Sequence, residues 1–81
     1  MTVYVVTKVF TEEETGGLAY IVEGVFKRPL NAAKYVAKQY GFENDRRVCS
    51  EITWDLLKNG TFDTTDLWAG RTYFIDLWKV E

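Results

Sequence analysis

The chain has 81 residues, with ten basic and twelve acidic side chains and a net charge of −2 at neutral pH. A chain of this length predicts a single domain over residues 1–81, and the near balance of charges disfavours a dedicated nucleic-acid binder, which carries a basic excess. Three Trp, five Tyr and five Phe accompany one Cys and no His. Because acid–base, nucleophilic and transition-metal sites depend on His, Cys or clustered carboxylates, we expect no enzymatic activity, metal site or cofactor.

Residues 2–11 predict a β-strand, because β-branched and aromatic side chains fill this segment. One face of this strand would carry Tyr4, Val6, Lys8 and Phe10, and the other Val3, Val5, Thr7 and Val9. The two glycines in residues 12–17 favour a turn, and residues 18–27 predict a second strand, so we expect a β-hairpin. Gly24, inside the second strand, indicates a bulge or a large neighbour packed against bare backbone.

A helix is predicted after the hairpin, from Pro29 to Tyr40. Proline suits the first helical position, because its missing N–H would have no partner there. Apolar residues recur at helical spacing along this segment, and Gly41 provides a stop signal. The amphipathic pattern predicts that the helix covers one face of the sheet.

Residues 44–60 admit two interpretations. Val48, Ile52 and Leu56 share one face whether the segment is a strand or a helix, and the Asn-Gly pair at 59–60 would end a helix. We predict a strand, because the Val, Ile, Thr and Trp residues of this segment prefer strands.

Residues 59–70 predict a loop, and residues 71–80 predict a final strand rich in aromatic residues. The expected order is β-β-α-β-β, with β-β-α-α-β as the alternative. Both orders give an α+β fold, a small antiparallel sheet with helix packed on one face. Such a sheet leaves its other face partly exposed, and the chain has more large apolar residues than one core face needs.

The polar loop carries large apolar side chains that either close the core or contact a partner. Loops carry function disproportionately, and Trp dominates binding hot spots. We predict that the chain is a non-enzymatic protein-binding domain with Trp68 as its anchor. The expected contact residues are Phe62, Asp63, Asp66, Leu67 and Trp68.

The alternative function is that of a nucleic-acid-binding accessory protein, in which Arg46, Arg47 and Arg71 act with the aromatic residues of the sheet. The lack of a basic excess makes a protein partner the preferred prediction. A sheet with two free edges also allows a homodimer, formed through an edge or through the open aromatic face.

The chain is expected to be cytoplasmic and free of membrane association. No apolar run approaches the ~20 residues of a membrane span, and no signal peptide precedes the first strand. The single Cys49 rules out a disulfide within the chain, as is usual for proteins of a reducing compartment.

Several segments resemble small uncharacterised proteins of bacteriophages and mobile elements of Gram-positive bacteria. They are Val-Tyr-Val-Val-Thr (3–7), Val-Glu-Gly-Val-Phe (22–26), Ala-Ala-Lys-Tyr-Val (32–36) and Phe-Ile-Asp-Leu-Trp-Lys-Val-Glu (74–81). Residues 42–70 share no part of the resemblance. It implies a cytoplasmic α+β domain without catalytic residues, encoded by a phage, which modulates or inhibits a host or defence protein.

Overall fold

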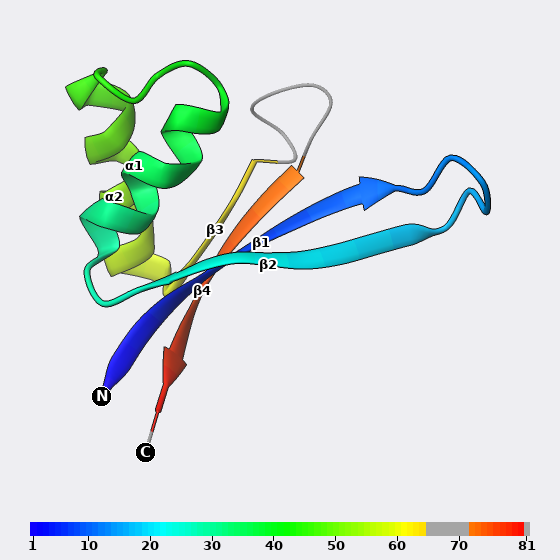
Figure 1. The fold of residues 1–81 in the computed structure, drawn as a ribbon. Helices are drawn as coiled ribbons and strands as arrows, with labels where there is room; N and C mark the ends of the chain where they lie inside the picture. Colours follow the sequence, from blue (N-terminus) through cyan, green and yellow to red (C-terminus); the bar gives the residue numbers. More distant parts are fainter. Residues whose placement is uncertain (65–71, 81) are drawn as a thin grey trace.

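The computed structural model describes residues 1–64 and 72–80, which form a four-stranded antiparallel sheet and two helices (Figure 1). The elements in chain order are β1 (Thr2–Thr11), β2 (Leu18–Phe26), α1 (Pro29–Gln39), α2 (Arg46–Asn59), β3 (Thr61–Asp63) and β4 (Thr72–Lys79). The strand order in the sheet is β2-β1-β4-β3, and each neighbouring pair is antiparallel. The predicted α+β class is therefore confirmed.

The β1–β2 hairpin contains the irregularity that the sequence predicts at Gly24. The register shifts between Val6 and Thr7, so that Glu23 becomes the extra residue of a bulge. A Cβ atom on Gly24 would lie 2.9 Å from the ring of Phe26. Both predicted reasons for a glycine here, a bulge and a large neighbour over bare backbone, are thus confirmed.

Residues 46–59 form helix α2, so the strand that we predicted over residues 44–60 is wrong. The observed order adds the short strand β3 to the alternative β-β-α-α-β. Helix α2 buries Cys49, Ile52 and Leu56, which recur at helical spacing, and leaves Trp54 exposed. Burial of this stripe against the rest of the protein outweighs the intrinsic strand preference of its Val, Ile and Thr residues.

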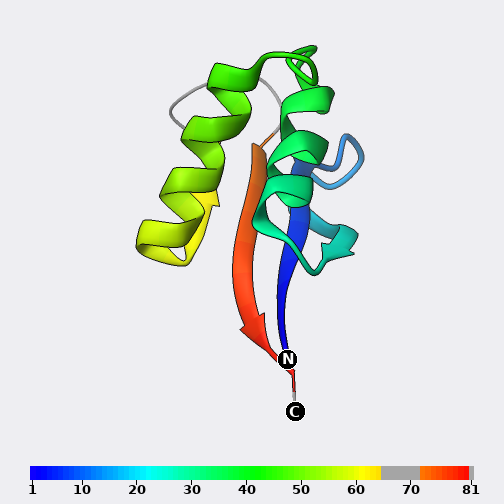
Figure 2. The same cartoon turned by 90° about the vertical axis from the view of Figure 1, so that its left-hand side faces the viewer.

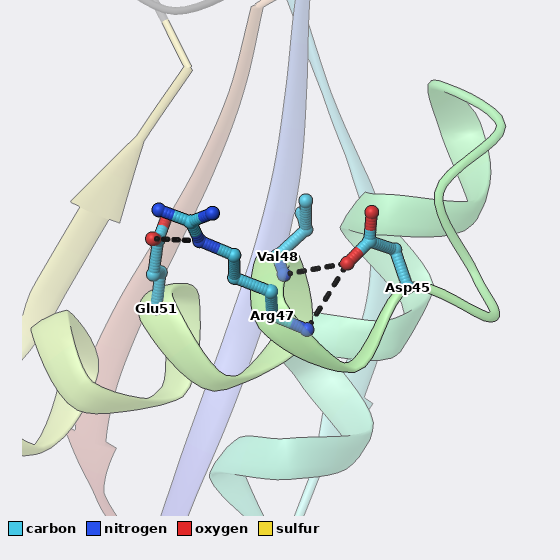
Figure 3. Close-up of polar contacts among 4 residues, drawn as sticks. All are labelled: Asp45, Arg47, Val48 and Glu51. Carbon is cyan, nitrogen blue, oxygen red and sulfur yellow. Dashed lines mark hydrogen bonds and ion pairs between the residues drawn. The ribbon is translucent and has the colours of Figure 1, made fainter.

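Both ends of α2 are capped, the first by the side chain of Asp45 and the second by the backbone of Gly60. The carboxylate Oδ1 of Asp45 accepts hydrogen bonds from the backbone N–H groups of Arg47 at 3.0 Å and Val48 at 3.2 Å (Figure 3). Gly60 takes a left-handed conformation with φ 73°, and its N–H donates to the carbonyl of Leu56 at 2.8 Å. These are the standard solutions for the unpaired groups at helix ends.

Both helices pack on the same face of the sheet, as Figures 1 and 2 show. The strands contribute Tyr4, Val6, Phe62, Tyr73 and Ile75 to a single buried cluster. The helices contribute Ala32, Ala33, Val36, Ala37, Cys49, Ile52 and Leu56. The alanines of α1 are fully buried, so this helix contributes small side chains to the core.

Thr64 is a polar residue that is fully buried in the described core. Its hydroxyl connects β3, β4 and the end of α1. Its Oγ1 accepts a hydrogen bond from the N–H of Tyr73 at 2.9 Å and lies 2.9 Å from the hydroxyl of Tyr40. The backbone N–H of Thr64 donates to the carbonyl of Tyr73 at 3.1 Å. The residue therefore joins the end of β3 to β4 and to the end of α1.

Asp45→Ala should lower the free energy of unfolding by ~1 kcal/mol, because two N–H groups at the start of α2 lose their acceptor. Chemical denaturation followed by circular dichroism measures this loss. Glu51→Ala is the matched control, since it removes only the exposed contact between Glu51 and Arg47 (3.5 Å) and should change stability little. Equal losses in the two variants would contradict the capping role of Asp45.

Thr64→Val should lower the free energy of unfolding by about 1–3 kcal/mol, because the buried N–H of Tyr73 loses its acceptor. Thr64→Ser keeps the hydroxyl and should recover most of this loss. The same denaturation measurement compares the two variants. If Thr64→Val is as stable as the parent chain, the hydroxyl does not hold β3, β4 and α1 together.

Candidate functional site

The face of the sheet opposite the helices follows from the strand register. Directly opposed residues of an antiparallel pair point to the same face, and Val6 and Ile75 are opposed and lie in the core. The neighbouring pair Thr7–Phe74 therefore points away from the helices. We call this second surface the open face. Its apolar members are Val3, Val5, Val9, Leu18, Tyr20, Val22, Val25, Phe74 and Trp78, and its polar members are Thr7, Thr11, Thr61, Asp63, Thr72 and Asp76.

The open face is apolar and uncovered by either helix. The exposed fraction is 66 % for Tyr20, 59 % for Trp78 and 58 % for Val25. Val3 is 8 % exposed although it lies outside the core cluster, and it is opposed to Trp78 in the register. Val3 is therefore shielded on the open face, whereas its neighbours leave large apolar side chains in contact with solvent, a feature that marks interaction sites in soluble proteins.

The charges that the described part of the chain places on the open face are both carboxylates. Asp76 is opposed to Val5 and is half-buried, and its Oδ1 accepts a hydrogen bond from the hydroxyl of Thr61 at 3.0 Å. Asp63 is exposed at the end of β3 and is opposed to Phe74. The surface therefore combines apolar area from β1, β2 and β4 with negative charge from β3 and β4.

The structure separates the predicted contact residues. Phe62 is opposed to Ile75 and is 7 % exposed, so its ring fills the core instead of standing free in a loop. Asp63 is exposed on the open face. Asp66, Leu67 and Trp68 lie outside the described residues, and their contact role stays a prediction.

The predicted basic residues do not join the aromatic residues of the open face. Arg46 and Arg47 are exposed in the first turn of α2, and the Nε atom of Arg47 lies 3.5 Å from Oε1 of Glu51 (Figure 3). Helix α2 covers the opposite face of the sheet from Tyr20. Arg71 lies outside the described residues. Among the described residues, the arginines and the exposed aromatic residues that nucleic-acid binding would need therefore lie on opposite faces of the sheet.

A groove of about 380 Å³ lies between the two helices near Cys49. It is lined by Leu30, Lys34, Glu43, Asn44, Arg46, Cys49 and Ser50. Burial raises the pKa of the Cys49 thiol, more than the nearby Lys34 lowers it. Its Sγ atom lies 3.9 Å from the carbonyl of Phe42. The thiol is therefore held protonated in the helix layer, which disfavours a nucleophilic role.

The described residues contain no group of three or more His, Cys, Asp or Glu side chains placed to hold a metal ion. Among residues 1–64 and 72–80, neither helix has the length and apolarity that a membrane span requires.

The sequence prediction missed Tyr20 and Trp78 as candidate contact residues. The sequence did contain a signal for an apolar second face, because β1 and β2 carry apolar residues at both odd and even positions. An antiparallel strand that is apolar on both sides needs cover on both faces. One layer of helices covers only one of them.

Comparisons with known proteins found no relative. The chain matches no protein-family model, no curated protein and no solved structure. The geometry of the open face and its chemistry therefore carry the functional proposal.

The thiol of Cys49 should react slowly with an alkylating reagent in the folded protein. It is 4 % exposed, and its raised pKa lowers the thiolate fraction at pH 8 below that of a free cysteine. Iodoacetamide labelling followed by mass spectrometry should show a rate at least ~10-fold higher after denaturation. Equal rates in native and denatured protein would show that the thiol is accessible and reactive.

Proposed function

We propose that this chain is a non-enzymatic protein-binding domain and that the open face is its main contact surface. The observation that carries the proposal is the exposure of the large apolar side chains of Tyr20, Val25 and Trp78 on a face that neither helix covers. Antiparallel sheets with one solvent-facing side usually present polar residues there. Burial of apolar residues on that side by a partner makes the free energy of binding more favourable.

The residue types on the open face fit the centre of a protein interface. Such centres are enriched in aromatic residues and depleted of charge, and Trp and Tyr are the commonest residues of high energetic weight. Tyr20 and Trp78 are large and exposed, whereas the carboxylates of Asp63 and Asp76 come from β3 and β4. The partner surface that fits is apolar, with Lys or Arg placed opposite these carboxylates.

The partner that we propose is a host or defence protein, which the chain modulates or inhibits by occupying its surface. This part of the proposal rests on the resemblance to phage and mobile-element proteins. A small domain with a large apolar face suits such a role, because binding alone blocks a surface and needs no catalytic group.

Nucleic-acid binding is the less favoured function. Platforms for single strands combine exposed aromatic rings with basic side chains along one groove. The described charges on the open face are acidic, and Arg46 and Arg47 belong to the helix layer. A nucleic-acid backbone would meet repulsion on the aromatic side of the sheet.

Trp78→Ala should weaken partner binding by about 2 kcal/mol, or roughly thirty-fold in Kd, and leave the fold intact. The partner would first be captured from nuclease-treated lysate of a Gram-positive host and identified by mass spectrometry. Its affinity for the parent chain and for the variant would then be measured by calorimetry. Thermal unfolding followed by circular dichroism checks that each variant folds.

Trp54→Ala is the matched control, because Trp54 is 68 % exposed on the helix layer. It should leave the affinity unchanged. Val25→Lys is a second open-face variant and should weaken binding as Trp78→Ala does. If Trp54→Ala weakens binding and both open-face variants bind normally, the open face is not the contact surface. Loss of every captured partner on nuclease treatment would favour nucleic-acid binding.

A further inference from the structure

Strand β2 presents an unprotected apolar edge. It forms one end of the strand order, so its outer side pairs with no other described strand. Its segment Leu18–Val22 contains no charged residue and no proline. Proteins normally protect a free edge with charges, proline, a bulge or a very short strand. Here Glu23 and the bulge follow only after this segment.

The same segment is exposed on both of its faces. Leu18, Tyr20 and Val22 are 60–66 % exposed on the open face, and Ile21 is 47 % exposed on the other face. Figure 1 shows the reason, because the β1–β2 hairpin extends beyond the helices. A partner can therefore approach the edge from the side without displacing any part of the described fold.

The direction of the free backbone groups follows from the sheet ladder. Met1 and Val80 exchange two backbone hydrogen bonds, of 2.9 and 2.7 Å. In an antiparallel ladder such pairs alternate with pairs that exchange none, so Val9 directs its N–H and carbonyl toward β4. Tyr20, which is opposed to Val9, directs its own groups outward. The same holds for Leu18 and Val22.

We propose that a second copy of this chain pairs with this edge, β2 against β2, about a two-fold axis at Tyr20. Tyr20 would exchange backbone hydrogen bonds with Tyr20 of the partner subunit. Leu18 would do so with Val22 of the partner subunit. On the other face, the small Ala19 would meet the larger Ile21 of the partner subunit. Every cross-strand pair within Leu18–Val22 is then apolar or aromatic, which is a stabilising arrangement.

The charge distribution favours a second copy over an unrelated strand. In this antiparallel arrangement, the hairpin turn of one copy runs toward the far end of β2 in the other. The turn carries Glu12, Glu13 and Glu14, and the far end of β2 is followed by Lys27 and Arg28. The acidic turn of one copy therefore lies at the same end of the interface as the basic pair of the other copy, and in this register Gly17 of the turn is opposed to Glu23 of the partner subunit.

The pairing does not rest on the proposed function, because its hydrogen bonds join backbone groups of Leu18, Tyr20 and Val22 and not their open-face side chains. The two-fold axis is perpendicular to the sheet, so the open faces of both copies lie on the same side. The four-stranded sheet would be doubled in width. A partner of the open face would meet one continuous surface built from two chains.

The first test is the molar mass in solution, measured by sedimentation equilibrium from about 5 to 200 μM, a range suited to a modest interface. The parent chain should reach twice its monomer mass of 9.4 kDa. Tyr20→Pro should stay monomeric, because it removes an outward N–H without removing a bond to β1. Tyr20→Lys should do the same, since it places like charges together at the axis.

Trp78→Ala is the control, because Trp78 lies on β4, away from the edge. It should remain dimeric even where it loses the partner of the open face. A monomeric parent chain over the whole range would overturn the proposal. So would a dimer that survives both Tyr20 variants, or one that only Trp78→Ala dissociates. Thermal unfolding confirms that each variant is folded.

Cysteine cross-linking tests the register. Tyr20→Cys should form a disulfide-linked dimer on mild oxidation, because opposed residues lie about 5.5 Å apart at Cα. Ala19→Cys should not, since the two Ala19 positions are about 8 Å apart in this register. The native Cys49 is 4 % exposed and should not interfere. Cross-linking of Ala19→Cys without cross-linking of Tyr20→Cys would overturn the axis at Tyr20.

Discussion

The packing of both helices on one face of the sheet is the constraint on which the rest of the structure depends. Ala33 and Val36 of α1, together with Ile52 and Leu56 of α2, bury Val6 and Ile75 and complete a small core. The helices then leave two regions without cover: the open face and the outer part of the β1–β2 hairpin (Figures 1 and 2). Tyr20, Val25 and Trp78 stay more than half exposed in the described part of the chain. A partner that covers them would remove this apolar area from water.

The hairpin could be predicted from the sequence because its signals are local. The alternation in residues 2–11, the glycines of the turn and Gly24 act through short-range geometry, and the structure confirms each of them. Helix α2 could not be predicted in the same way. Its residues prefer strands intrinsically, and the choice was decided by burial of Cys49, Ile52 and Leu56 against distant segments. The N-cap at Asp45 was the local signal that could have indicated the helix.

The candidate site shows the same division between local and distant information. The excess of apolar residues over the needs of one core face is visible in the sequence. Which residues form the excess depends on register and on which face the helices choose. Phe62 looks like a loop residue in the sequence, yet β3 directs it into the core. Trp78 and Tyr20 look like ordinary strand residues, yet they lie on the face that no helix covers.

Hydroxyl-radical footprinting of the purified chain tests the central claim, that the open face is exposed to solvent until a partner binds. Trp78 and Trp54 are the matched pair of probes, at 59 % and 68 % exposure on opposite layers. We predict similar oxidation rates for both side chains in the free protein, and selective protection of Trp78 when the partner is present. Protection of Trp78 in the free protein, with Trp54 fully reactive, would contradict it, because the open face would already be covered.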